Sequence, residues 1–325
     1  MHRDGPAMRI VAAVLKSVLM GAVMSVGLGI ATAWAQTFTS VLFVGNSFTF
    51  GSGSAVRFYR ADTVTDLNSE GIGGVPALFK SFADQAGLFY DVSLETRSGS
   101  GLDFHLENKL GVIGRRPWDI VVMHGQSTLD FDKPGDPAKL VATSRQMADF
   151  LRSRNPKVEI HLMSTWSRAD QTYPPSGAWA GKPIEAMARD VRAGNDRAAA
   201  STPSVRSVLP VGEAWTRAMQ TGVADPNPYD GIAPGKVNLW TYDHYHASTH
   251  GYYLEALVIF GRLTGRDPRS LGENECSGFE LGLPRTEVKA LQQVAFDQLS
   301  ATGPVTPAPL VLPRPVAPER CAPGR

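Results

Sequence analysis

The sequence of 325 residues has little of several features that would direct it to a particular class of protein. Its two cysteines, Cys276 and Cys321, lie far from any cluster of residues suited to catalysis. It has no long basic run and no interleaving of basic with aromatic residues, and its formal net charge is +1, so nothing predicts a nucleic-acid partner. No internal repeat is visible, and from residue 36 onward no apolar run could span a bilayer. This part of the sequence is typical of an ordinary soluble globular protein, long enough to bury one large core.

One long apolar run is present, and it lies at the N-terminus. Residues 1–9 carry positive charge, and residues 10–32 are almost wholly apolar, small or hydroxylated. Ala-Trp-Ala follows at residues 33–35, which is the small-x-small pattern that a signal peptidase requires. A membrane anchor is the alternative, but Lys16 interrupts the run and the cleavage site favours removal. We therefore predict a signal peptide over residues 1–35, a secreted or periplasmic protein, and no stable membrane insertion after cleavage.

The C-terminal part raises the question of a disulfide. In an oxidising compartment, Cys276 and Cys321 could pair. The bond would fix a tail, residues 303–325, that is rich in proline and poor in large core residues. Spacing alone does not establish disulfide geometry, so the pairing stays open at this point. No linker with a shift in composition interrupts the preceding residues, and we predict a single domain over residues 36–302.

The pattern of apolar residues predicts the fold class. Short runs rich in branched residues alternate with longer segments of helical periodicity. This alternation predicts a parallel sheet with helices on both faces, a flavodoxin-like three-layer α/β/α sandwich. Five strands are expected, at residues 40–44, 90–95, 119–123, 158–163 and 204–209. Helices are expected at residues 76–85, 136–153, 184–199, 249–263 and 284–300, with longer loops at residues 50–74 and 164–182.

The first expected strand leads directly into Gly-Asn-Ser-Phe-Thr at residues 45–49. Ligands of an open parallel sheet bind at the carboxyl ends of its strands, so Ser47 lies where chemistry is expected. Gly45 allows a tight turn, and the short side chain of Asn46 can hydrogen-bond to its own backbone. Gly, Asn and Ser are also ordinary turn residues, so this motif alone is a weak indication of a nucleophile.

A second polar motif, Tyr-Asp-His-Tyr-His at residues 242–246, lies just before the expected helix at residues 249–263. A serine hydroxyl needs an imidazole to accept its proton and a carboxylate to fix the tautomer of that imidazole. Asp243 and His246 are three residues apart, so one turn can bring the carboxylate to Nδ1 while Nε2 points outward. The spacing fits a catalytic triad with Ser47.

An early Gly-Asn/Asp-Ser and a late Asp-x-x-His, in this order, resemble the SGNH/GDSL hydrolase superfamily. The first block of that family usually reads Gly-Asp-Ser, whereas this chain has Asn46 and is similar to a branch of uncharacterised SGNH-like proteins with Gly-Asn-Ser-Phe-Thr. Gly-Tyr-Tyr-Leu-Glu-Ala at residues 251–256 is similar to that branch as well. The resemblance implies a serine esterase without a cofactor, in which Ser47 takes the acyl group and His246 acts as base and then as acid.

The resemblance also implies an oxyanion hole, made by the N–H of Ser47, a glycine after the second strand and an amide side chain after the third. Gly99, in Ser-Gly-Ser-Gly-Leu at residues 98–102, is the better match for the glycine because it lies three residues before the leucine. Gln126 takes the place of the family's asparagine, and its longer side chain shifts the donor. One such donor is commonly worth about 3 kcal/mol. His105 is expected to pack beside this loop.

Three alternatives remain. A metal-dependent hydrolase would leave the turn at Ser47 unexplained, and its ligands would be Asp243, His244, His246 and His250. An α/β-hydrolase needs a G-x-S-x-G elbow, which residues 45–49 and 125–129 do not supply. A carbohydrate-binding protein that kept the fold and lost turnover is the alternative outside the enzymes. The favoured partner is a small-molecule or polysaccharide ester, such as an O-acetyl group on a carbohydrate. The sequence indicates no oligomeric state.

Overall fold

The computed structural model describes residues 38–303 and residue 321. These residues belong to one compact unit, Thr37–Arg325. The signal peptide predicted at residues 1–35 and most of the tail predicted at residues 303–325 lie outside the described residues. No helix of the described part combines the length and the apolar character needed to cross a membrane.

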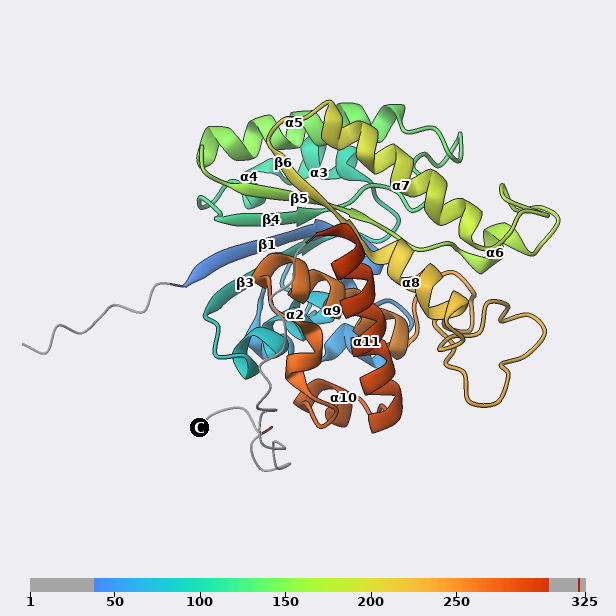
Figure 1. Ribbon diagram of the computed structural model, residues 1–325. Helices are drawn as coiled ribbons and strands as arrows, with labels where there is room; N and C mark the ends of the chain where they lie inside the picture. The colour runs from blue at the N-terminus through green and yellow to red at the C-terminus, as the bar shows by residue number, and fades with distance from the viewer. Residues whose placement is uncertain (1–37, 304–320, 322–325) are drawn as a thin grey trace, which may run out of the picture. The chain divides into compact units, whose positions relative to one another are not determined.

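A parallel sheet of six strands forms the centre of the unit (Figure 1). The strands lie in the order β2-β3-β1-β4-β5-β6, and every neighbouring pair is parallel. Their bounds are Thr39–Gly45 for β1, Thr65–Asp66 for β2, Tyr90–Thr96 for β3, Ile120–Met123 for β4, Glu159–Ser164 for β5 and Val205–Pro210 for β6. The chain continues from β1 first to one side of the sheet and then to the other. The carboxyl end of β1 is therefore the topological switch point, where open α/β sheets bind ligands.

The predicted flavodoxin-like strand order is confirmed, but the prediction of five strands is wrong. The additional strand, β2, lies within the region that we expected to be a loop, residues 50–74. It has two residues and pairs only with β3 at the edge of the sheet. Such a short strand has no periodicity that a sequence pattern could reveal. The other strands begin and end within one or two residues of the predicted bounds.

Helices cover both faces of the sheet, so the predicted three-layer arrangement is confirmed (Figure 1). One face carries α1 (Ser47–Phe50), α2 (Gly74–Gln85), α8 (Val211–Gln220), α9 (Thr249–Thr264), α10 (Cys276–Glu280) and α11 (Arg285–Thr302). The other face carries α3 (Leu102–Asn108), α4 (Leu110–Ile113), α5 (Ala138–Arg154) and α7 (Glu185–Ala200). A single turn, α6 (Ala169–Thr172), follows β5, and 3₁₀ turns lie at Ala55–Phe58, Ala61–Thr63 and Pro268–Leu271.

The alternation of side chains along β1 builds both cores. Val41 and Phe43 belong to the core shared with α2 and α9, whereas Leu42 and Val44 belong to the core shared with α3 and α5. A strand buried on both faces has a continuous apolar sequence, which is why β1 was visible as an apolar run. Because both faces are packed, the end of β1 is fixed from above and below.

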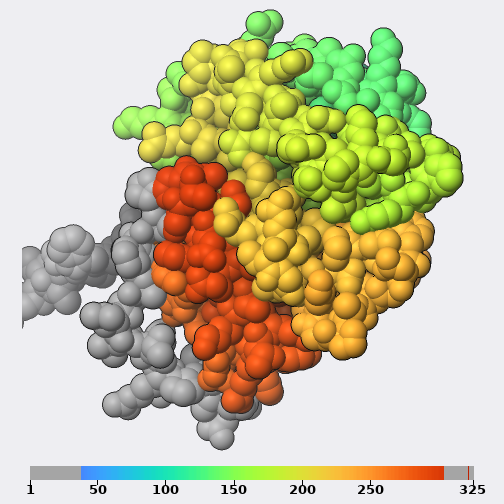
Figure 2. Space-filling view, turned by 45° about the vertical axis from the view of Figure 1, so that its right-hand side comes forward, coloured from blue at the N-terminus to red at the C-terminus, as the bar shows by residue number. Residues whose placement is uncertain are grey.

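Helix α9 is buried on nearly all sides. Every residue from Gly251 to Gly261 is buried, and the helix contacts α2, α8 and α11. Figure 2 shows α8 and α11 adjoining each other at the surface. The hydroxyl of Ser248 accepts a hydrogen bond from the N–H of Gly251 at the start of α9, and Gly265, with φ of 68°, ends it. The predicted motif at residues 242–246 thus leads into a rigid element.

Stacked aromatic rings connect α1 with the helical layer beneath it. The ring of Phe48 stacks on Trp166 at 4.0 Å between centroids, and Trp166 stacks on Trp215 at 4.5 Å. Trp166 and Trp215 are fully buried. Trp179, in the same loop as Trp166, is also buried and donates its indole N–H to Asp190. These two tryptophans of the loop after β5 are therefore packing residues.

Cys276 and Cys321 form a disulfide with 5.2 Å between their Cα atoms. Cys276 is the first residue of α10, and the carbonyl oxygen of Cys321 accepts a hydrogen bond from Arg60. The guanidinium of Arg60 also forms an ion pair with Glu280 of α10. The bond attaches residue 321 to the face of the unit that carries α2 and α10.

Candidate active site

The backbone at Ser47 is held from two sides. Ser47 is the first residue of α1, and the side-chain oxygen of Asn46 caps this helix by accepting the N–H of Phe48 at 3.1 Å. The hydroxyl of Tyr252, on α9, lies 3.2 Å from the carbonyl oxygen of Ser47 and 3.1 Å from that of Ser52. Since Tyr252 is fully buried, it connects the turn at Ser47 to the core.

The same turn packs closely on the end of β4. A Cβ on Gly45 would lie 2.2 Å from Oγ1 of Thr49 and 2.5 Å from Nε2 of His124, so no larger residue fits. Nδ1 of His124 lies 3.0 Å from the carbonyl oxygen of Gly125, and Nε2 lies 2.8 Å from the hydroxyl of Thr49. A carbonyl only accepts, so Nδ1 donates and Nε2 accepts from Thr49. Burial lowers the pKa of His124 to about 4, which keeps the ring neutral.

Asp243 and His246 meet as their spacing predicted. Nδ1 of His246 lies 2.6 Å from Oδ2 of Asp243, and Oδ1 accepts the N–H groups of Tyr245 at 3.0 Å and His246 at 2.9 Å. Burial alone would raise the pKa of Asp243, but the hydrogen bonds from His246 and from these N–H groups hold it below its usual value. The carboxylate is therefore ionised, and Nδ1 of His246 carries the proton that it binds.

The other nitrogen of His246 is unoccupied. Nε2 is buried and has no hydrogen-bond partner among the described residues, so it makes no hydrogen bond to Ser47 in this structure. Ser47 and His246 are nevertheless connected through Phe48. Phe48 follows Ser47 in the sequence, and its ring meets the ring of His246 edge-on at 5.8 Å between centroids. Catalytic hydrogen bonds are often long in unliganded sites and shorten when substrate binds.

Gly99 and Gln126, two of the residues predicted for the oxyanion hole, are in contact. Nε2 of Gln126, after β4, donates a hydrogen bond to the carbonyl oxygen of Gly99, after β3. Gly99 has φ of 69°, a conformation in which glycine carries no steric cost. Gly99 follows β3 and Gln126 follows β4, the two strands that flank β1. The structure brings the two loops together.

Asn46 joins the three loops that carry the predicted residues. Its amide nitrogen donates to the carbonyl oxygens of Ser100 at 2.9 Å and Gly125 at 3.3 Å, while its oxygen caps α1. An ionised aspartate, which has no N–H, could make only the capping bond. The departure from Gly-Asp-Ser at this position is therefore matched by two acceptors that require an amide.

The four ligands of the metal alternative do not share one set of partners. Asp243 pairs with His246, whereas Nε2 of His250 lies 2.6 Å from the carboxylate of Glu287. The ring of His244 packs on the ring of Tyr229, with 4.2 Å between their centroids. In the part of the chain that the structure describes, no group of three or more His, Cys, Asp or Glu residues is arranged to hold a metal ion.

Arg168, in the loop after β5, has no sequence signal but connects two parts of the site. Its guanidinium lies 3.5 Å from the ring centre of Tyr245, the neighbour of His246, and 3.3 Å from the hydroxyl of Ser127, the neighbour of Gln126. Asp170 holds it with two hydrogen bonds of 3.0 and 2.6 Å. Only the folded chain reveals this contact, since the residues lie on three separate loops.

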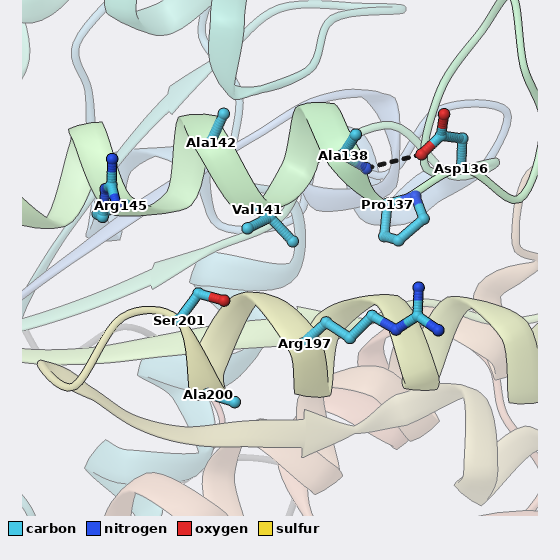
Figure 3. Close-up of a pocket in the computed structure, with 9 residues that line it drawn as sticks. All are labelled: Asp136, Pro137, Ala138, Val141, Ala142, Arg145, Arg197, Ala200 and Ser201. Carbon is cyan, nitrogen blue, oxygen red and sulfur yellow. Dashed lines mark hydrogen bonds between the residues drawn. The ribbon is translucent and has the colours of Figure 1, made fainter.

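A groove of about 660 Å³ lies elsewhere, between α5 and α7 (Figure 3). It is lined by Asp136, Pro137, Ala138, Val141, Ala142, Arg145, Arg197, Ala200 and Ser201. None of the predicted site residues is among them. The groove is therefore distinct from the candidate active site.

No protein-family model and no curated protein matches the chain. Among solved structures, the chain is similar to a DUF4886 family protein from Bacteroides uniformis, with 16% identity, a TM-score of 0.55, and coverage of 83% of this chain and 98% of that one. A proposed SGNH hydrolase from Slackia heliotrinireducens has 18% identity, a TM-score of 0.47 and coverage of 70% and 100%. An acetylxylan esterase from Geobacillus stearothermophilus has 15% identity, a TM-score of 0.46 and coverage of 68% and 92%. Likeness at such identities shows a shared fold and no more.

Proposed function

We propose that the protein is a serine esterase in which Ser47 is the nucleophile and His246 the base. The observation that carries this proposal is the geometry of His246. Its Nδ1 is hydrogen-bonded to the carboxylate of Asp243 at 2.6 Å, its Nε2 is buried and has no partner among the described residues, and its ring packs edge-on against Phe48, the residue that follows Ser47. An imidazole held in this tautomer has its free nitrogen available for a hydroxyl proton.

The reaction proceeds in two halves. The hydroxyl of Ser47 gives its proton to Nε2 of His246 as its oxygen bonds to the carbonyl carbon of the ester, and Asp243 stabilises the resulting imidazolium. His246 then gives the proton to the departing alcohol, which leaves the acyl group on Ser47. Water then attacks the acyl group and gives a proton to Nε2 of His246, which passes it to Oγ of Ser47 as the carboxylic acid leaves. Every proton moves between Ser47, substrate, water and His246.

The oxyanion of each tetrahedral intermediate would be bound by the N–H of Ser47, the N–H of Gly99 and the amide of Gln126. One N–H of Gln126 is used by the carbonyl oxygen of Gly99, and an amide has a second N–H to offer. This bond also supports the placement of Gly99 near the other donors. A single donor of this kind contributes about 10²- to 10³-fold to kcat.

We propose an extracytoplasmic ester as the substrate, such as an O-acetyl group on a carbohydrate. The predicted signal peptide supports a secreted or periplasmic location, and so does the disulfide between Cys276 and Cys321, because such bonds persist in oxidising compartments. The partner is then a small-molecule or polysaccharide ester.

The test is an ester panel, from p-nitrophenyl acetate to acetylated oligosaccharides, with the purified chain from residue 36. Ser47→Ala and His246→Ala should each lower kcat about 10⁴-fold or more, because each removes a group that acts as a unit with the other. Ser144→Ala is the matched control, since Ser144 is a buried serine of α5. A fluorophosphonate should label Ser47. Unchanged hydrolysis in Ser47→Ala or His246→Ala would sink the mechanism. Saturable glycan binding without any hydrolysis would favour the non-catalytic alternative.

A further inference from the structure

A second serine, histidine and carboxylate lie in line behind the loop that carries Gly99. Nε2 of His105 lies 3.2 Å from the hydroxyl of Ser100, and Nδ1 of His105 is bonded to the carboxylate of Glu95. The side chains of His105 and Glu95 are 0% exposed. We refer to Ser100, His105 and Glu95 as the buried network.

The hydrogen bonds of Ser100 show that it is no second nucleophile. Its hydroxyl donates to the carbonyl oxygen of Arg97 at 2.8 Å, and a hydroxyl has only one proton. The oxygen of Ser100 can then only accept from His105, so Nε2 of His105 carries a hydrogen. A base whose free nitrogen already carries a proton cannot activate a serine.

The other nitrogen of His105 donates as well. Burial acts to raise the pKa of Glu95, but the hydrogen bond and charge of His105, the amide of Asn68 and the charge of Lys109 together hold it below its usual value. Nζ of Lys109 lies 3.7 Å from Oε1 of Glu95, and the amide of Asn68 lies 3.2 Å from the same oxygen. With Glu95 ionised, Nδ1 of His105 donates to it, so both ring nitrogens of His105 are used as hydrogen-bond donors.

The buried network acts on the loop through Ser100. The hydroxyl of Ser100 connects His105 to the backbone of Arg97, and the carbonyl oxygen of Ser100 accepts from Asn46. In the sequence, Gly99 lies between Arg97 and Ser100, whose backbone carbonyl oxygens are both hydrogen-bonded, and its own carbonyl oxygen accepts from Gln126. The loop is therefore fixed from the core by His105 and from the site by Asn46 and Gln126.

We propose that Glu95 and His105 are positioning residues for the oxyanion hole, which hold the N–H of Gly99 toward the reacting carbonyl oxygen. This inference rests on the proposed esterase function. Neither side chain is exposed, so both act through Ser100 and the loop. Misplacing a group in an active site by about 1 Å can cost about 10²-fold in rate.

The test compares His105→Phe, His105→Gln and Glu95→Gln in ester hydrolysis. We expect His105→Phe to lower kcat about 10- to 100-fold with KM unchanged, because the lost interaction is made only in the transition state. His105→Gln keeps one donor and should retain more activity than His105→Phe. His161→Gln is the control, since His161 is a buried histidine of β5 that is hydrogen-bonded to Ser207 at 2.9 Å.

Two activity results would overturn the inference while the esterase stands. One is an unchanged kcat in folded His105→Phe, and the other is an equal fall in His161→Gln. A wild-type protein that hydrolyses no ester would instead count against the proposed function. Nitrogen-15 NMR tests the hydrogen bonds of the buried network directly. We expect both ring nitrogens of His105 to be protonated at neutral pH. We also expect the amide signal of Gly99 to shift in Ser100→Ala but not in His161→Gln. A neutral His105 ring or an unmoved Gly99 signal would refute it.

Discussion

Two histidine–carboxylate pairs lie near the end of β1, and their differences are more informative than their likeness. His246 and Asp243 have side chains that are 14% and 30% exposed, whereas those of His105 and Glu95 are 0% exposed. The second ring nitrogen of His246 has no partner among the described residues, while that of His105 is bonded to Ser100. Only the ring of His246 therefore has a nitrogen that is free to accept a proton. A histidine–carboxylate pair alone therefore does not identify a catalytic base. What identifies it is a second ring nitrogen without a hydrogen-bond partner.

A third pair offers a reference for both. His250 at the start of α9 and Glu287 at the start of α11 lie 2.6 Å apart, with side chains 23% and 35% exposed. This pair uses Nε2 of the imidazole and joins two helices. Its exposure is similar to that of the Asp243 pair, so it separates the effect of losing an ion pair from the effect of losing a triad member.

Among the variants that compare these pairs, the largest effect is expected for Asp243→Asn. The amide no longer fixes the tautomer of His246, and kcat should fall about 10³- to 10⁴-fold. Glu287→Gln, which alters the reference pair, should leave kcat within about twofold, because a partly exposed histidine–carboxylate pair contributes little. An equal loss of activity in the two variants would remove the distinction between the pairs.

The pH profile sharpens the same point. The pKa of Asp243 lies below its usual value, so its carboxylate is ionised at and above its ordinary pKa of about 4. Its contribution to stability is present above that pH and is lost as the pH falls through the lowered pKa. Measurements of kcat/KM from pH 4 to 9 should show no ionisation of Asp243 in this window. A step in the wild-type profile near pH 4 to 5 that is absent from the profile of Asp243→Asn would contradict the lowered pKa of Asp243.

A smaller effect is expected for Asn46→Asp, which restores the usual residue of the family. The new carboxylate would face the carbonyl oxygens of Ser100 and Gly125 without a proton to donate. We expect kcat to fall about 10- to 100-fold as the loops separate. Because burial and these carbonyls raise the pKa of such a carboxyl, the loss in Tm should be small at pH 4 and grow toward pH 8.

The control for that variant is Asn195→Asp. Asn195 is buried in α7, and its amide donates to the carbonyl oxygen of Val191 at 2.9 Å. This substitution should cost stability in the same way but leave kcat unchanged. If both variants lose activity in parallel with Tm, then Asn46 acts only through stability and its bonds to the loops have no special role.

The smallest effect is expected for Glu255→Gln, a carboxyl group buried without any histidine. Glu255 is 1% exposed on α9, neither of its oxygens has a hydrogen-bond partner among the described residues, and burial raises its pKa well above its usual value. It is protonated when folded, whereas the unfolded chain releases the proton above about pH 4.3. Its contribution to stability is thus lost as the pH rises. The Tm of Glu255→Gln relative to wild type should increase from pH 4 to pH 8, and a constant difference would contradict the assignment.

The sequence predicted those features that depend on local pattern. Short runs rich in branched residues predicted the five longer strands, and a separation of three residues sufficed to predict the contact of Asp243 with His246. The order of the two motifs placed Ser47 at the end of β1. His105 was expected beside the loop of Gly99, and it lies there.

Features that depend on packing between distant segments were not visible. The two amide bonds of Asn46 and the stacking of Arg168 on Tyr245 join loops that only the sheet order brings together. Helix α8 was missed, and it begins at Val211 directly after β6 ends at Pro210. The ion pair between Glu213 of α8 and Arg192 of α7 is another contact of this kind.

The stacked rings of Phe48, Trp166 and Trp215 have a spectroscopic consequence. Trp166 and Trp215 lie with their planes only 4° apart, and Phe48 joins them to the residue proposed as nucleophile. Near-UV circular dichroism depends on the fixed packing of such rings and vanishes when that packing is lost. A change at α1 should therefore be visible in the dichroism of the folded protein even when no substrate is known.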